Sequence, residues 1–544
     1  MAVAMPHVMV LPFPAQGHVT PLMELSHRLV DHGFQVTFVC TEPVHKLVLD
    51  ALRQNGGGEA LDVIRLVSIP DGLADGDDRR DLCKFLDGVS RCIPSYVEDL
   101  IRETKVRWLV GDANMGMCFE AAKKLGVRVA CVFPASAAGL GTLLRLPQLI
   151  EDGFFDDKGP RKKSPASIQW PPPYPSSLAP PYPSPVAAPI AAGRPPRRRL
   201  VAAPSPPRRR PVVPFSPSVR PSRRPVFCWL GPPSPSRFVH VAGYVNKCFP
   251  KRRGAFEIAP NMPPMYTSHM PWSIDGAAEG QEVSFRLVSR NTQATSLAEI
   301  VVCNSFLQAE AAAFELFPSI VPIGPLFADQ EFRKTAGQFL LEDTGCLKWL
   351  DAHPDGSVVY VAFGSFTVFD PRQFRELAEG LELTGRPFLW VMRPDFTTGG
   401  LSKAWFDEFT NRVVVNGSGM IVSWCPQQQV LAHRAVGCFV SHCGWNSTME
   451  GVRNGVPILC WPYFVDQFAN RSYICDIWRT GMAVTPGEDG VVTKEEVIAK
   501  LGLVIGDKGI AERARMLRDA ARNSLKEGGS SYKNFKRFVD LLRE

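Results

Sequence analysis

The sequence predicts an α/β protein made of two doubly wound domains that face a cleft. Its 544 residues exceed what a single hydrophobic core usually supports, so two or three compact units are expected. Short apolar runs alternate with helical patterns in two separate series, one in each half of the chain. Alternation of this kind is typical of parallel sheets covered by helices on both faces.

In the N-terminal half, strands are predicted at residues 7–12 and 35–40, with a helix at 20–32 between them. The strands are continuous apolar runs, whereas the apolar residues of the helix recur at helical spacing. A strand, helix and strand in this order indicate a parallel sheet. The unit recurs further along, with strands at 107–111 and 128–133 and a helix at 117–125.

The second series starts near residue 340. It predicts strands at 357–363, 387–392, 419–423, 437–441 and 457–461, a helix at 371–383 and a last amphipathic helix at 509–542. We therefore expect an N-terminal domain over 1–325, a linker over 326–345 and a C-terminal domain over 346–544, whose last helix can pack back on the first domain. Ligands of such sheets bind at the carboxyl ends of the strands.

Residues 160–250 differ in composition from the rest of the chain. No Asp or Glu occurs between Asp157 and Glu257, and residues 160–235 hold 24 of the 49 prolines. Dense proline and clustered arginine predict a disordered or polyproline-like insert rather than a packed domain. The insert holds 15 Lys or Arg, so the remaining chain has a formal charge of −8, against +7 for the whole. The basic overall charge therefore gives little support to a nucleic-acid or membrane partner.

Hydropathy and cysteine usage exclude further classes. No run approaches the roughly 18 consecutive apolar residues that a spanning helix needs, so no integral membrane association is expected. The 14 cysteines are scattered, without metal-ligand spacing and without a secretory signal, which indicates free thiols in the cytoplasm. We expect a monomer with no metal site and no nucleic-acid partner.

The most informative stretch is residues 424–467. A predicted strand ends just before His442, and a turn rich in hydrogen-bond donors leads into a helix that begins near Asn446. Such a turn offers backbone N–H groups and the positive helix end to a phosphate, and His442 adds a donor that can be cationic. A simpler interpretation is a capping box from Ser447 to Glu450 that only starts the helix.

These 44 residues resemble the plant secondary-product glycosyltransferase signature of family 1 UDP-glycosyltransferases. The resemblance covers about residues 5–158 and about 251 to the C-terminus. It implies the GT-B fold, with two Rossmann-like domains, and metal-independent transfer of a sugar from a UDP-sugar to a small acceptor, with inversion at the anomeric carbon. Relatives cross the region of the insert in far fewer residues.

The resemblance also implies a role for each matching residue of the signature. Trp424 would stack on uracil, Gln427 would lie near the nucleoside and Glu450 would hold the ribose hydroxyls; His442, Asn446 and Ser447 would bind the diphosphate; Trp445, Asp466 and Gln467 would contact the sugar. A final Gln in this signature is associated with glucose donors, so UDP-glucose is expected as the donor substrate, with no other cofactor.

The N-terminal half is expected to supply the base. His18 lies in residues 14–21, a predicted loop at the carboxyl end of the first strand. A neutral imidazole can take a proton from an acceptor hydroxyl if a partner fixes its tautomer, and Asp112, after the 107–111 strand, is the candidate. The resembled family has a His–Asp dyad at such positions. Ser365, after the 357–363 strand, is expected near the phosphates.

The acceptor is expected to be a small hydrophobic plant metabolite with a hydroxyl or carboxyl group. Its pocket would be formed by Phe85, residues 134–136 and residues 262–272, with Ser136 touching donor or acceptor. Two alternatives remain: a nucleotide-sugar-binding relative that the insert has inactivated, and an RNA- or anion-binding protein that acts through the arginine clusters. A further hypothesis is that the insert is translated non-coding sequence, which sequencing of the transcript tests.

Overall fold

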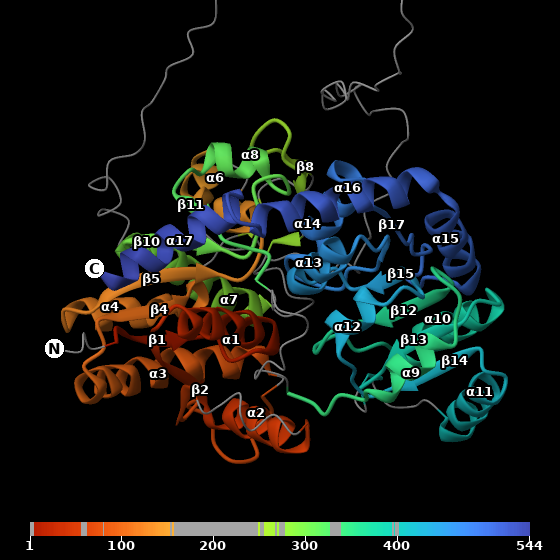
Figure 1. Cartoon of the computed structure of the whole chain (residues 1–544), viewed down its shortest axis with the longest axis horizontal. Coiled ribbons are helices and arrows are strands. Elements are labelled where there is room, and N and C mark those ends of the chain that lie inside the picture. The colour runs from red at the N-terminus through yellow and green to blue at the C-terminus, as the bar shows by residue number, and fades with distance from the viewer. Residues whose placement is uncertain are drawn as a thin grey trace, which may run out of the picture. The chain divides into compact units, whose positions relative to one another are not determined.

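Two parallel sheets, one in each half of the chain, form the framework of the computed structural model (Figure 1). Both sheets belong to one compact unit, made up of Met1–Trp170 and His240–Glu544. The predicted insert lies outside the described residues, apart from 249–250. The structure describes residues 5–55, 63–79, 81–152, 155–156, 249–250, 255–266, 269–270, 278–326, 339–393, 396–397 and 402–544.

The first sheet has seven parallel strands in the order β11-β10-β5-β4-β1-β2-β3. Helices cover both faces, so β1, β4 and β5 are buried almost throughout, and they lie where continuous apolar runs predicted strands. The strand order reverses between β1 and β4, and the crevice at such a switch point is where doubly wound sheets bind ligands. The strands are β1 (His7–Leu11), β2 (Gln35–Thr41), β3 (Ile64–Ile69), β4 (Trp108–Asp112), β5 (Arg128–Phe133), β10 (Ile300–Cys303) and β11 (Ile320–Pro322).

The second sheet has six parallel strands in the order β14-β13-β12-β15-β16-β17. Its switch point lies between β12 and β15, whose carboxyl ends lead to Ser365 and to His442 respectively. The strands are β12 (Val358–Ala362), β13 (Phe388–Val391), β14 (Gly419–Val422), β15 (Val436–Ser441), β16 (Ile458–Cys460) and β17 (Gly481–Ala483).

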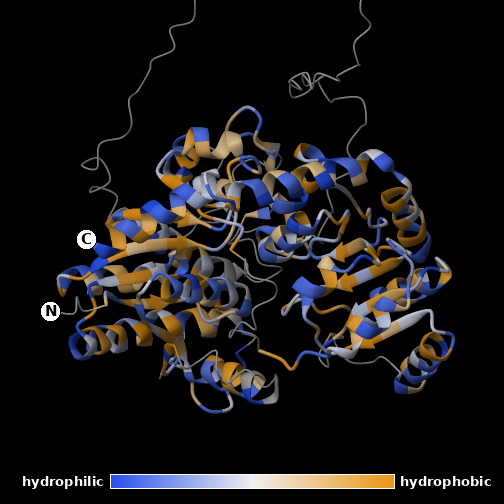
Figure 2. Cartoon of the chain, viewed as in Figure 1, coloured by the Kyte–Doolittle hydropathy of each residue, from blue (hydrophilic) through white to orange (hydrophobic). Residues whose placement is uncertain are grey.

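Helices flank both sheets, and Figure 2 shows largely hydrophobic strands beside helices that alternate between hydrophobic and hydrophilic sides. In the first half they are α1 (Gln16–Asp31), α2 (Glu42–Asn55), α3 (Leu82–Thr104), η2 (Ala113–Cys118), α4 (Phe119–Lys124), α5 (Ala137–Leu144), α6 (Leu146–Glu151), α7 (Ala278–Ala294), η5 (Thr295–Leu297) and α8 (Ala311–Leu316). In the second half they are α9 (Gly345–Asp351), α10 (Pro371–Leu383), α11 (Lys403–Val415), α12 (Gln427–Ala432), α13 (Trp445–Asn454), α14 (Gln467–Ser472), η6 (Tyr473–Ile477), α15 (Lys494–Gly506), α16 (Lys508–Leu525) and α17 (Ser530–Arg543). Two short antiparallel pairs complete the described elements: β6 (Phe155–Asp156) with β7 (Phe249–Pro250), and β8 (Ala255–Phe256) with β9 (Met265–Tyr266).

The single C-terminal helix predicted over 509–542 is wrong, because the chain breaks between α16 and α17. Gly528 has a φ of +82°, and a Cβ on Gly529 would lie 2.4 Å from a backbone oxygen of α16. After this turn, α17 lies beside the first sheet (Figure 1). Its Phe538 and Leu542 join the buried cluster of β1 and β2, and Asn534 Nδ2 donates to Pro322 O at 2.9 Å.

No helix in the described part of the chain is long and apolar enough to cross a membrane. The described cysteines are all free thiols.

Candidate functional site

A cavity of about 1120 Å³ lies where the carboxyl ends of both sheets meet. It brings together residues that are more than 400 positions apart in the sequence, because each sheet contributes the loops at its own switch point. Eleven of the twelve predicted site residues line it: His18, Ser365, Trp424, Gln427, His442, Trp445, Asn446, Ser447, Glu450, Asp466 and Gln467. The twelfth, Asp112, is fully buried directly behind His18.

His18 and Asp112 form a hydrogen-bonded pair. His18 Nδ1 lies 2.7 Å from Asp112 Oδ2, and Asp112 Oδ1 accepts from the Asn114 N–H at 2.8 Å. A carboxylate only accepts, so Nδ1 carries the proton and Nε2 of the neutral ring is the free base. The predicted loop over 14–21 is wrong: Ala15 is the N-cap of α1, which places His18 in the first turn of that helix.

The pKa of His18 is set by opposing effects. Burial by itself lowers this pKa, but the charge and hydrogen bond of Asp112, together with the charge of Asp466, raise it above its ordinary value. The ring also packs edge-on against Phe13, with 5.2 Å between centroids, which restricts its orientation. The arrangement is that of a positioned general base whose protonated form is stabilised.

The turn after β15 holds His442 between two glycines. A Cβ would lie 2.6 Å from His442 Nε2 if placed on Gly364 and 2.5 Å if placed on Gly444, so both positions require glycine. Cys443, between His442 and Gly444, has a φ of +65°, which is uncommon for a residue with a side chain. Burial lowers the pKa of His442 to about 4, which opposes the cationic form considered from the sequence. His442 therefore acts as a neutral group.

The capping-box interpretation is also wrong. Gly444 is the N-cap of α13, so Ser447 lies within the first turn and does not cap the helix. Instead, Gln427 Nε2 donates to Ser447 Oγ at 3.0 Å and to the Glu450 carboxylate. Burial raises the pKa of Glu450 to about 7. The three side chains form one polar surface at the cavity wall beside Trp424.

Tyr360 completes this network and was missed by the sequence reasoning. Its hydroxyl donates to Gln427 Oε1 at 2.9 Å and lies 3.3 Å from Cys425 Sγ. Because Oε1 is thereby fixed as the acceptor, the Gln427 amide group must turn Nε2 toward Glu450. The one available signal was a tyrosine within the otherwise aliphatic strand β12.

The three residues predicted to contact the sugar, Trp445, Asp466 and Gln467, each form hydrogen bonds with other groups of the protein. Trp445 is only 3% exposed, and its indole N–H donates to Asn304 O at 2.7 Å. Gln467 Oε1 accepts from the backbone N–H groups of residues 463 and 464 at 2.7 and 3.0 Å. Asp466 accepts from Asn470 Nδ2 at 2.9 Å. Residue 465 is a valine with a φ of +57°, and such strain is usual at ligand-binding turns.

Arg393 is a second residue that the sequence reasoning missed. It is 6% exposed, and its guanidinium donates to Gly364 O and, at 3.0 Å, to Thr367 O. It therefore holds in place the loop that carries Ser365, whose Gly364 lies against the His442 ring. Its position two residues after a buried strand was the only indication in the sequence.

The side of the cavity next to α1 and α3 is mainly apolar. Phe85 and residues 134–136 line it as predicted, and Ser136 also caps α5 by accepting from the Gly139 N–H at 3.0 Å. The prediction for residues 262–272 is wrong where it can be examined: Met262 and Met270 are buried in the core. Residues 267–268 and 271–272 lie outside the described part of the chain.

Comparison with known proteins agrees with this geometry. Residues 305–520 match the family model for UDP-glucoronosyl and UDP-glucosyl transferase. UDP-glycosyltransferase 83A1 from Arabidopsis thaliana is 34% identical over 552 residues, covering 99% of this chain and 97% of that protein. The chain belongs to the plant family 1 UDP-glycosyltransferases.

Other plant UDP-glycosyltransferases are similar over the same extent. 7-deoxyloganetin glucosyltransferase from Gardenia jasminoides is 28% identical over 571 residues, with 98% of this chain and 97% of that protein covered. The crystal structure of Os79 from O. sativa in complex with UDP has 25% identity and a TM-score of 0.67, with 98% of this chain and 100% of Os79 covered. The predicted GT-B fold and the predicted class of UDP-dependent glycosyltransferase are thus confirmed.

Proposed function

We propose that this UDP-glycosyltransferase transfers glucose from UDP-glucose to a hydroxyl of a small hydrophobic metabolite, with inversion at the anomeric carbon. The observation that carries the proposal is the His18–Asp112 pair, which presents a basic Nε2 to the cavity that also contains the donor signature. As the acceptor oxygen attacks the anomeric carbon, its proton passes to His18 Nε2. The bond from that carbon to the β-phosphate oxygen breaks, and UDP leaves with the electron pair.

The donor half of the cavity suits a nucleotide sugar. Trp424 offers a flat surface for a base, and the Glu450 carboxylate, held by Gln427, can accept hydrogen bonds from ribose hydroxyls. Asp466 and Gln467, which line the cavity in the segment after β16, would contact the sugar, and the resemblance of a final Gln to glucose-specific signatures favours UDP-glucose. The name of the Gardenia relative also specifies a glucosyltransferase.

The departing diphosphate requires stabilisation, and α13 can provide it. Its first turn has Gly444 as N-cap and directs backbone N–H groups and the positive end of the helix dipole toward the cavity. His442, which burial keeps neutral, adds a hydrogen bond rather than a charge. Preorganised donors of this kind are a major source of rate acceleration. No metal or other cofactor enters the proposed reaction.

The acceptor half favours an apolar molecule. Phe13, Phe85, Leu143, Leu287 and Val288 line it, so a flat or aliphatic body can be buried there while one hydroxyl approaches His18. We also propose that the enzyme works as a cytoplasmic monomer, in keeping with its free thiols. Gel filtration with light scattering and cell fractionation test these two points.

The deciding experiment incubates the full-length protein with UDP-glucose and a panel of phenolic, terpenoid and carboxylic acceptors, beside His18→Ala. Wild-type turnover to a β-glucoside, identified by its anomeric NMR coupling, is expected, with at least a 100-fold loss in the variant. Undiminished turnover in His18→Ala would remove the proposed base. UDP binding without turnover on any acceptor would favour the inactivated, binding-only alternative.

A further inference from the structure

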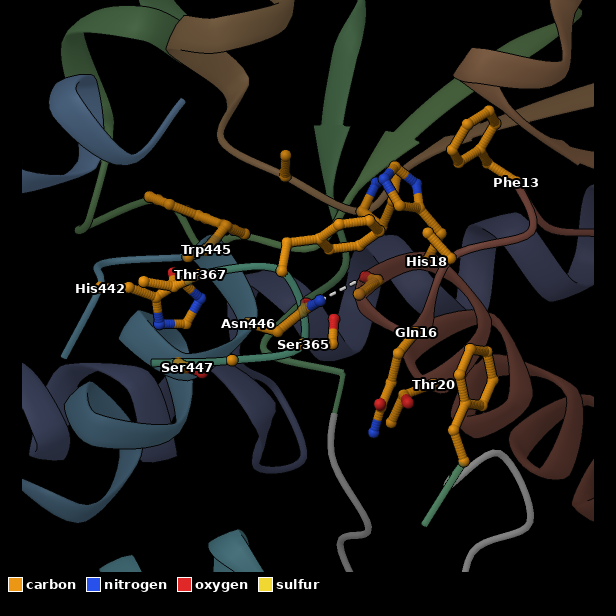
Figure 3. A pocket seen from close by; sticks show the side chains of 18 of the residues that line it. Phe13, Gln16, His18, Thr20, Ser365, Thr367, His442, Trp445, Asn446 and Ser447 are labelled. Atoms are coloured by element: carbon orange, nitrogen blue, oxygen red, sulfur yellow. Dashed lines mark hydrogen bonds between the residues drawn. The ribbon is translucent and has the colours of Figure 1, made fainter. Parts of the chain in front are cut away.

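Asn446 connects the donor-binding helix to the helix that carries the base. Its Nδ2 donates to the backbone carbonyl of Gly17, the residue before His18 (Figure 3). In a regular helix, the carbonyl of Gly17 would accept from the N–H of residue 21. That residue is Pro21, which has no N–H, and it lies inside α1. The proline therefore leaves the Gly17 carbonyl available to a donor from the other half of the chain.

Asn304, directly after β10, holds the other end of the Asn446 amide. Asn304 Nδ2 donates to Asn446 Oδ1 at 3.0 Å, and Asn304 Oδ1 accepts from the Leu326 N–H at 2.6 Å. Asn304 is fully buried, and its backbone oxygen accepts the Trp445 indole N–H at 2.7 Å. It thus contacts two consecutive residues of the first turn of α13.

The series of hydrogen bonds from Leu326 through Asn304 and Asn446 to Gly17 has only one consistent donor-to-acceptor direction. The Leu326 N–H can only donate, so Asn304 must accept with Oδ1 and donate with Nδ2. Asn446 must then accept with Oδ1, which leaves its Nδ2 to donate to the Gly17 carbonyl. A chain in which every donor and acceptor is assigned in this way favours one arrangement of the elements that it joins.

We propose that Asn304 and Pro21 are positioning residues that, through Asn446, set the separation of His18 from the donor-binding turn. The inference rests on the proposed function, because its consequence is the alignment of base, acceptor oxygen and anomeric carbon. Displacements of about 1 Å between reacting groups cost about 100-fold in rate. Neither residue needs to touch a substrate for this effect.

Two variants disrupt this series of hydrogen bonds at different points. Pro21→Ala restores an N–H that competes for the Gly17 carbonyl, and Asn304→Asp replaces the required donor with an acceptor. Each is expected to lower kcat about 10- to 100-fold while the KM for UDP-glucose changes less than about threefold. Because both substitutions disrupt the same series of hydrogen bonds, kcat of the double variant should fall much less than the product of the two single losses. Asn304→Ser, whose side chain is short and uncharged, is a second test variant at that position and is expected to show the same kind of loss.

Matched controls exist for both substitutions. Pro94 also lies inside a helix, α3, but does not line the cavity, and Asn534 also donates to a distant backbone carbonyl. Pro94→Ala and Asn534→Asp should leave kcat unchanged within about twofold. Equal losses in the controls, unchanged kcat in both test variants, or fully multiplicative losses would overturn the proposal.

Hydrogen exchange separates this proposal from the proposed function. Peptides that cover residues 13–20 and 444–448 should exchange faster in Asn304→Asp than in the wild type and Asn534→Asp, with or without UDP. The exchange measurement needs no turnover, so it tests the series of hydrogen bonds even if the wild type transfers no sugar. Identical exchange in all three proteins would contradict a link between α13 and α1.

Discussion

Asp112 Oδ2 lies 2.7 Å from His18 Nδ1, and the pair joins the end of β4 to the first turn of α1 at the switch point of the first sheet. Burial lowers the pKa of His18, but Asp112 and Asp466 together raise it above its usual 6.5. The base works only when neutral, so activity must be lost as the pH falls through that raised value. We expect the acid limb of kcat/KM to have an apparent pKa above 6.5. A pH–rate profile of the wild type checks this, and a limb below 6.5 would contradict the pairing.

Asp112→Asn should separate the two effects of the carboxylate. Without its charge, burial dominates and the pKa of His18 falls, so the acid limb moves to lower pH. At the same time kcat should fall about 100- to 10,000-fold, because the charge that contributes most to stabilising the imidazolium is removed. The pH–rate profile and the plateau rate measure both quantities. Asp370→Asn, at the N-cap of α10, is a control that keeps a capping side chain and should match the wild type.

Two glycines should prove essential for diphosphate binding because they flank the His442 ring. Gly364→Ala and Gly444→Ala place a Cβ within 2.6 Å of Nε2, and we expect UDP affinity to fall about tenfold or more. Calorimetric titration with UDP measures this. Gly356→Ala is the control for Gly364→Ala, since its φ of +65° is close to the +68° of Gly364 but nothing lies within 4 Å of its Cβ. It should bind UDP normally and lose only about 1–2 kcal/mol of folding stability.

UDP binding should depend on the ionisation of Glu450. Burial raises the pKa of this carboxyl to about 7, and the ionised form accepts ribose hydroxyls more strongly. Affinity should therefore rise as the pH increases from about 6 to 8. UDP itself titrates in this range, so the comparison is with Glu450→Gln, whose weaker binding should lack the part of the pH dependence that comes from the protein. Parallel pH profiles for the two proteins would exclude this role.

Tyr360→Phe should weaken donor binding without touching the donor. The variant removes the hydroxyl that fixes the Gln427 amide, and the lost hydrogen bond is worth about 1 kcal/mol, or about fivefold in UDP affinity. Calorimetry beside Tyr532→Phe, an exposed tyrosine on α17, provides the comparison. Equal affinities in both variants would show that Gln427 is oriented by other contacts.

The regular elements could be predicted because local patterns reflect burial. The strand at 128–133 is observed over the same residues, since a parallel strand buried on both faces is one apolar run. The helix at 371–383 is also observed as predicted, with Asp370 as its cap and a proline at its first position. The predictions were wrong at 14–21, where helix α1 begins despite Pro21, and at Gly528, where a local glycine turn divides one predicted helix into two.

The sequence by itself determined the family and the donor-binding stretch, because residues 424–467 are contiguous and their chemistry can be read in order. Only the tertiary structure decided that His442 is neutral, since burial depends on what packs around it. Likewise, no local pattern identifies Asn304, whose partners include Asn446, 142 positions away. Hydrogen-bond direction, protonation and the distance between base and donor arise from contacts between segments that only folding brings together.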